Sequence, residues 1–228
     1  QNNVVDKFQT NENGIGSSKK LPLGIYTVKE VQAPANYGLN PTVFTADIEF
    51  AGQVVKLNVT DPVITAGVSI KKTGYAQTMN NNVMRWTVSG VRNDSTTSLQ
   101  SFYWRDTLPT DAVRLTRLVT GTYSTTQTYK VTFTTNLNSQ WRTAYDNLST
   151  AKNYTLDMSS AALGLASNEY VTQFMLSFGI VPAGFHQLTN ATVDAQTLYA
   201  LTNGYKFTNK ADVGGLLGGN WVQSIARW

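Results

Sequence analysis

The run GIYTVKEVQAPANYGLN, residues 24–40, constrains the fold most, because few backbone plans place a strand of this pattern directly before Ala-Pro. Tyr26, Val28 and Glu30 share one parity, so a strand would direct all three side chains to the same face. Burying an ionised carboxylate beside two apolar side chains is costly. We therefore expect Glu30 either at the solvated end of the strand or protonated and hydrogen-bonded in a reactive site.

Composition favours an all-β protein. The chain has 228 residues, of which 41% are hydrophobic, enough for a sizeable core in one large domain or two smaller ones. Charged residues make up only 14%, against roughly 25% in ordinary soluble domains. Thr, Asn, Gly and Tyr are abundant, which is typical of strands and turns. We favour two domains.

Several functional classes are not expected. The chain has no cysteine, and its single histidine, His186, has no partner at metal-ligand spacing, so we predict neither a metal nor a cofactor. The net charge of +4 is dispersed, which argues against nucleic-acid binding. No apolar run reaches the roughly 20 residues that span a bilayer, so no membrane contact is expected. Without a Gly-x-Ser-x-Gly elbow or a marked acid pair, a turnover enzyme is not expected either.

Turn signals divide the chain near residue 62. Before that point we expect a strand over residues 3–8, the strand through Tyr26, and a terminal hairpin of residues 43–50 and 53–61. The alternation of Val68, Ile70 and Lys72 then begins a new strand. The predicted domains are residues 1–62 and residues 63–228.

The second domain contains short apolar-periodic segments separated by turn residues. Residues 159–165 form its only plausible helical turn. Strands are predicted over residues 84–91, 99–106, 115–119, 129–135, 170–180, 204–210 and 221–228. Several short strands at this spacing indicate a β-sandwich.

Three polar residues end apolar-periodic strands of this domain: Lys72, Asp106 and Asn209. Parity turns each of them inward, where an isolated polar group would be costly. Together they supply an amine, an acid and a carboxamide. Burial is expected to lower the pKa of Lys72 and to raise that of Asp106, so that both are neutral. Lys72 would then attack the Asn209 side-chain carbonyl while Asp106 relays protons, forming an isopeptide bond and releasing ammonia.

Each member of this set also has a simpler explanation. Lys72 follows Lys71 near a strand start, where lysines are usually solvated, and a one-residue slip would place Lys71 inward instead. Asp106 could cap a turn, and Asn209 could be a turn residue. The agreement of three parities favours the crosslink.

The run at residues 24–40 resembles the glutamate-box strand of Cna-B-type, prealbumin-like domains of Gram-positive surface pilins and adhesins. The resemblance covers nearly all of residues 1–62. It implies that Glu30 is a catalytic acid and Asp61 a bond acceptor, with a lysine from a strand upstream of Gln1. Neither Lys7 nor Lys19 or Lys20 matches that position, so this site is incomplete and no bond is expected there. Alternatively, Asp61 caps the final strand.

The segments VSIKKTG, FYWRDTLP and YKFTNKADVGG are similar to the crosslinking strands of clostridial-type isopeptide-forming pilin-related proteins. This resemblance extends over most of residues 66–228. It implies an autocatalytic bond between Lys72 and Asn209, assisted by Asp106. The expected fold is two tandem β-sandwiches, immunoglobulin-like or prealbumin-like, of which the first is incomplete at its N-terminus.

We therefore expect a structural stalk, a pilin or adhesin subunit that is extracellular and attached to the cell wall by a sortase signal outside this sequence. Its partners would be neighbouring domains of the same surface protein. The alternative is an adhesive module that binds a glycan or a host protein through exposed aromatic rings. The aromatic residues considered for that role are Trp86, Tyr103, Trp104, Trp141 and Tyr145.

Overall fold

The chain divides into two units, Gln1–Val63 and Ile64–Trp228. The computed structural model describes residues 3–35, 37–77, 82–198, 201 and 204–228. Every regular element in these ranges is a strand, which confirms the all-β prediction. The described ranges contain no helix of the length and hydropathy that crossing a membrane requires.

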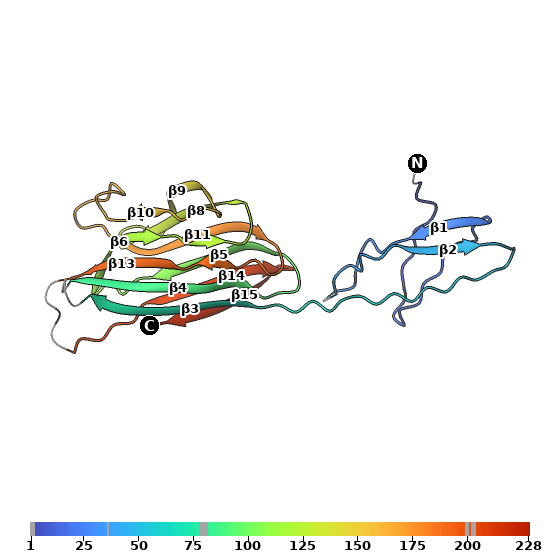
Figure 1. Cartoon of the computed structure of the whole chain (residues 1–228), viewed down its shortest axis with the longest axis horizontal. Coiled ribbons are helices and arrows are strands. Elements are labelled where there is room, and N and C mark those ends of the chain that lie inside the picture. The colour runs from blue at the N-terminus through green and yellow to red at the C-terminus, as the bar shows by residue number, and fades with distance from the viewer. Residues whose placement is uncertain (1–2, 36, 78–81, 199–200, 202–203) are drawn as a thin grey trace. The chain divides into compact units, whose positions relative to one another are not determined.

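The N-terminal unit contains one antiparallel pair of strands, β1 (Gly24–Val28) and β2 (Phe44–Ile48), seen in Figure 1. Side chains alternate in exposure along β1: Tyr26 is half-buried and Ile25 is exposed. The expected strands over residues 3–8 and 53–61 are wrong, because β2 pairs with β1 and those segments join no ladder. Apolar alternation alone does not hold a strand, because its backbone groups also need a hydrogen-bonded neighbour.

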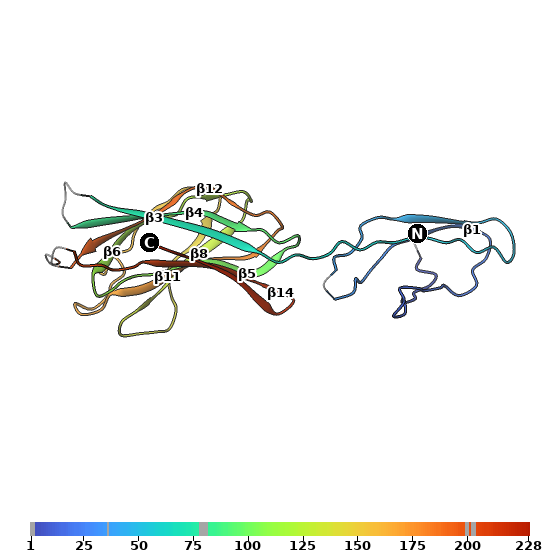
Figure 2. The same ribbon diagram turned by 90° about the horizontal axis from the view of Figure 1, so that it is seen from below.

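The C-terminal unit is a sandwich of two main sheets, with β3 and β4 in one layer and β5, β11 and β14 in the other (Figure 2). The five-stranded sheet has the order β10-β6-β13-β4-β3, formed by β3 (Val68–Gln77), β4 (Val83–Asn93), β6 (Val113–Val119), β10 (Thr155–Asp157) and β13 (Ala191–Thr197). The six-stranded sheet has the order β15-β14-β5-β11-β8-β9, formed by β5 (Leu99–Thr107), β8 (Thr128–Thr135), β9 (Arg142–Ser149), β11 (Val171–Val181), β14 (Lys210–Leu217) and β15 (Asn220–Arg227). A small pair, β7 (Thr122–Tyr123) and β12 (Gln187–Thr189), completes the unit.

The core between the two sheets is strongly aromatic. Trp86 of β4, Trp104 of β5 and Phe174 of β11 are completely buried, and Trp104 meets Phe174 edge to face at 5.7 Å between ring centroids. Rings of this size dominate the apolar area removed from water. The apolar residues that alternate along these strands in the sequence are the ones that pack in this core.

The structure corrects the expected strand at residues 204–210, since β14 begins only at Lys210 and continues to Leu217. Its two central glycines, Gly214 and Gly215, are typical of a turn but lie within the strand. A methyl group on Gly214 would sit 2.9 Å from the ring of Tyr103, and one on Gly215 would sit 2.9 Å from Leu99. Both positions have space for no more than hydrogen.

The irregularity in the pairing of β3 with β4 lies in β4. Ser69 pairs with Arg92, but Lys71 pairs with Ser89, so β4 carries the extra residue, near Gly90, whose φ is +64°. Because the bulge is in β4, β3 keeps a strict alternation. That alternation buries Lys72 and leaves Lys71 exposed.

Candidate functional site

A lysine and an aspartate meet between the two sheets. Lys72 lies on β3, the edge strand of one sheet, and Asp106 lies on β5 of the other. Lys72 Nζ donates to Asp106 Oδ2 at 2.5 Å, and both side chains are 0% exposed. A short, charge-assisted hydrogen bond therefore connects the two layers in a site that is closed to water.

Asn209 lies beside this pair. The next two residues, Lys210 and Ala211, pair with Thr107 and Asp106 in the ladder of β14 with β5. Asn209 is 0% exposed, and neither its Oδ1 nor its Nδ2 has a hydrogen-bond partner among the described residues. Asp106 Oδ1 is unpaired in the same sense. Buried polar atoms without partners are costly and unusual, so this cluster calls for a chemical explanation.

Burial raises the pKa of Asp106, and this effect outweighs the opposing influences of Lys72 and of the Asn209 amide. The Asn209 amide is near enough to favour the charged carboxylate, although Nδ2 and Oδ1 do not reach hydrogen-bond geometry. For Asp106, this is the direction expected from the sequence. Burial therefore favours the neutral carboxylic acid at Asp106 more than at an exposed aspartate.

Aromatic rings cover the cluster. The Trp86 ring centroid lies 5.7 Å from Lys72 Nζ, and Phe207 meets Trp86 edge to face at 6.4 Å. These rings exclude water and give the lysine a weakly attractive face. The sequence analysis did not assign Trp86 or Phe207 to this site, although Trp86 shares its parity with the inward-facing Met84 and Val88.

The two acids expected in the N-terminal unit have different surroundings. Glu30 is half-buried just beyond β1, and its Oε2 accepts a hydrogen bond from the Asn40 amide at 2.7 Å. Asp61 is half-buried with its Oδ1 unpaired among the described residues, and because no strand covers residues 53–61 it caps none. The ion pairs found within the described ranges join neither acid to a lysine. The absence of a bond at this site stays a prediction.

Most of the aromatic rings considered for glycan binding are unavailable to a ligand. Trp86 and Trp104 are 0% exposed and Tyr103 is 7% exposed, so these rings belong to packed interiors. Tyr145 donates its hydroxyl to the Asp157 carbonyl. Only Trp141, at 39% exposure, offers a substantial open surface.

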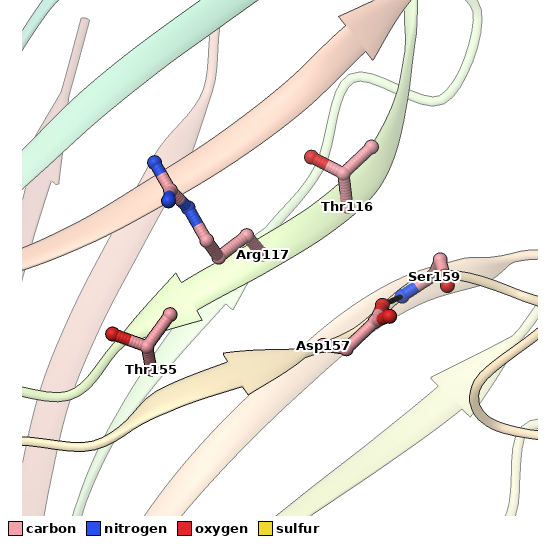
Figure 3. Close-up of a pocket in the computed structure, with 5 residues that line it drawn as sticks. All are labelled: Thr116, Arg117, Thr155, Asp157 and Ser159. Carbon is pink, nitrogen blue, oxygen red and sulfur yellow. Dashed lines mark hydrogen bonds between the residues drawn. The ribbon is translucent and has the colours of Figure 1, made fainter.

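An open pocket lies elsewhere on the sandwich, on β6, β10 and the turn that follows β10 (Figure 3). The Ser159 amide donates to Asp157 Oδ1 there, and Arg117 is held by Asp194. The sheet order places β13 and β4 between this pocket and β3, so it is separate from the Lys72 cluster. Its lining residues are Thr116, Arg117, Thr155, Asp157 and Ser159. No group of His, Cys, Asp and Glu suited to a metal ion occurs among the described residues.

Comparisons with known proteins find a similar family for the N-terminal unit. Residues 1–63 match the SpaA family of prealbumin-like fold domains. No curated protein sequence matches the chain. A crystal structure of the major pilin subunit of Bacillus cereus aligns over 98% of this chain with 12% identity and a TM-score of 0.32, and this chain spans 59% of that one. Residues 1–63 are therefore similar to the SpaA prealbumin-like domains, which agrees with the Cna-B-type resemblance of the glutamate-box strand.

Proposed function

We propose that the chain is a stalk segment of a Gram-positive surface pilus or adhesin, and that an autocatalytic bond between Lys72 and Asn209 locks its C-terminal unit. The SpaA-type domain supports the first part of this proposal. The observation that carries the second part is the 2.5 Å contact of Lys72 with Asp106 beside a buried, unpaired Asn209 carboxamide.

The reaction begins when the Lys72 ammonium passes a proton to Asp106. The neutral Nζ then attacks Cγ of Asn209, and protonated Asp106 donates a hydrogen bond to the developing oxyanion at Oδ1. As the tetrahedral intermediate collapses, the Cγ–Nδ2 bond breaks and Asp106 relays a proton to Nδ2. The products are a secondary amide and one ammonia, with no oxidant or cofactor. Each chain reacts once, so the protein is not a turnover enzyme.

The bond suits a load-bearing role. It would join β3, the first strand of the C-terminal unit, to the residue immediately before β14. Force arriving through β3 would then bypass most of the intervening strands, and unfolding between residues 72 and 209 would be restricted by a covalent tie. Resistance of this kind depends on the unfolding rate rather than on equilibrium stability alone. The partners in this proposal are neighbouring domains of an extracellular, wall-attached protein.

Intact mass of the purified chain tests the proposal. We expect a mass lower than that of the sequence by one ammonia, and a digested peptide pair joined through Lys72 and Asn209. Lys71→Met is the matched control, because Lys71 is the exposed neighbour, and it should retain the bond. Lys72→Met should show its full mass. The unmodified mass in the parent chain, or a bond that maps to Lys71, would refute the assignment.

A further inference from the structure

Asn209 is held by Trp228 through a reciprocal backbone pair. The Asn209 amide donates to the Trp228 carbonyl at 2.8 Å, and the Trp228 amide donates to the Asn209 carbonyl at 3.0 Å. This pair continues the antiparallel ladder of β14 and β15 by one step beyond Lys210 and Arg227. The backbone that carries the reacting carboxamide is thus fixed by a residue outside the reactive set.

The side chain of Trp228 reaches the strand that carries the lysine. Gly74 follows Lys72 by two residues on β3 and shares its face. A methyl group on Gly74 would lie 2.8 Å from Trp228 Cε3 and 2.6 Å from Trp86 Cδ1. Two indole rings therefore lie against the glycine backbone, in the space that a side chain would otherwise occupy.

We propose that Gly74 and Trp228 form a clasp that positions Asn209 for attack by Lys72, which makes Trp228 a positioning residue for the crosslink. This inference rests on the proposed Lys72–Asn209 bond. Before any covalent bond exists, the clasp links β3 to the segment at Asn209. The Trp228 indole packs against Gly74 of β3, and the Trp228 backbone pairs with Asn209. It reduces the freedom that the carboxamide would lose on reaching the attack geometry, and so raises the rate of bond formation.

The chain supplies a matched control for this role. Trp221 lies on β15, which ends one residue before Trp228. It is 55% exposed, and Trp228 is 44% exposed. Its ring meets Tyr103 edge to face at 5.9 Å. Trp228 lies seven positions after Trp221, and an odd offset places the two side chains on opposite faces of an extended chain. Removing Trp221 deletes a comparable ring without touching Gly74 or Asn209.

The test is the rate at which freshly made chain of residues 1–228 loses ammonia. The chain is synthesised in a cell-free reaction and quenched at intervals, and the reacted fraction is measured by intact mass. The protease resistance of samples taken at the same times measures the folded fraction. We expect Trp228→Ala to slow ammonia loss by roughly tenfold to a hundredfold after folding is complete. Trp221→Ala should react at the parent rate. Trp228→Phe, which restores a flat ring over Gly74, should recover most of the rate.

The outcomes separate the clasp from the crosslink itself. If Trp228→Ala folds and reacts as fast as the parent chain, the clasp is wrong and the crosslink stands. If Trp228→Phe is as slow as Trp228→Ala although both fold, packing over Gly74 is not the cause, and the inference fails. A parent chain that keeps its full mass overturns both proposals.

Hydrogen exchange of the Asn209 amide tests the clasp in a chain that cannot form the crosslink. In a Lys72→Met chain, which has no nucleophile, the Asn209 amide still donates to the Trp228 carbonyl in the described geometry. We expect Trp228→Ala to accelerate exchange of that amide at least severalfold relative to Trp221→Ala. Equal exchange in the two variants would contradict the clasp, whether or not the crosslink forms.

Discussion

Lys72 Nζ and Asp106 Oδ2 lie 2.5 Å apart between the two sheets of the C-terminal sandwich, with both side chains fully buried. A buried ion pair of this kind is rarely the most stable way to fill a core, since an apolar pair of similar volume often stabilises as well or better. The unpaired Asn209 carboxamide beside it adds a further cost. This arrangement has the groups that the proposed Lys72–Asn209 reaction would need, and the following predictions test it.

Replacing Asp106 by alanine should stop the crosslink. Without the acid, Lys72 has no proton acceptor, and the developing oxyanion has no donor. The variant should keep its full mass on intact mass measurement, and it should be destabilised because a buried amine loses its partner, by about 3 to 5 kcal/mol.

Asp212→Ala is the control for this prediction. Asp212 is also a buried acid, but it lies on β14, and its carboxylate accepts hydrogen bonds from Tyr103 and Arg105. Its loss should also lower stability while the chain still loses one ammonia. If Asp106→Ala reacts normally, the proton relay has been assigned to the wrong residue.

Lys72→Met should isolate the contribution of the bond to stability. Methionine fills a similar volume and leaves no unpaired ammonium, so the main change is the missing tie between residues 72 and 209. Closing a loop on the order of 100 residues stabilises by about 5 kcal/mol when the effect on the unfolded chain dominates. The free energy of unfolding in urea should fall by about that amount. A loss of less than about 1 kcal/mol would mean that no loop is closed in the parent chain.

The same variant should reveal the raised pKa of Asp106. Burial is the main cause of that shift, and Lys72 opposes it, so removing Lys72 leaves the pKa higher still. A folded-state pKa above the unfolded value of about 4 means that the folded chain binds the proton more tightly. This contribution to stability is complete below pH 4 and is lost as the pH rises through the folded pKa, by about 1.4 kcal/mol per pH unit.

Urea denaturation of Lys72→Met between pH 4 and pH 8 measures this loss. The double variant Lys72→Met/Asp106→Asn is the control, because asparagine has the same shape and does not titrate. The two chains should differ in their pH dependence, with Lys72→Met losing more stability toward pH 8. Parallel pH profiles would show that Asp106 is not the buried acid described above.

The sequence predicted much of the sandwich because its strands alternate strongly. Val68, Ile70 and Lys72 lie on one face of β3 as expected, so the alternation that buries Ile70 also buries Lys72 rather than Lys71. The burial of Asn209 was also predicted, but for the wrong reason. The inward parity of Asn209 came from an expected strand over residues 204–210, but residues 204–209 form a loop. Asn209 is buried because it continues the ladder that β14 forms with β15.

Other parts could not be predicted because their determinants are far apart in the sequence. Gly214 lies within a strand since the Tyr103 ring covers it, and no local pattern reveals a neighbour from β5. Trp86 was considered for glycan binding. Alternation shows which residues of a strand share a face, but it does not show which face another sheet covers. In the N-terminal unit, alternation over residues 53–61 suggested a strand where no partner strand pairs with it.

Tyr123→Phe should destabilise the sandwich without affecting the crosslink. The buried Tyr123 hydroxyl accepts from Trp104 Nε1 at 2.8 Å and donates to the Thr120 carbonyl at 3.0 Å. Phenylalanine leaves both partners buried and unsatisfied, at a cost of about 1 to 3 kcal/mol. Tyr145→Phe removes a hydroxyl whose single hydrogen bond is exposed, and should cost less than about 1 kcal/mol. Both variants should still lose one ammonia, measured by intact mass, with urea denaturation reporting the difference in stability.

A protease site at Ser139 should show the crosslink by its topology. Ser139 is exposed in the connection between β8 and β9, and it lies between residues 72 and 209 in the sequence. After cleavage there, the two pieces of a crosslinked chain stay joined by the Lys72–Asn209 amide, even in denaturant and reductant. They should run as one species on a denaturing gel, and the same cut in Lys72→Met should give two. A second site in the connector at residues 64–66 supplies the internal control, because it precedes Lys72 and its cleavage must release the N-terminal unit from both chains. Because the sequence has no cysteine, no disulfide can hold the two pieces together, and separation of the Ser139 products in the parent chain would exclude the crosslink.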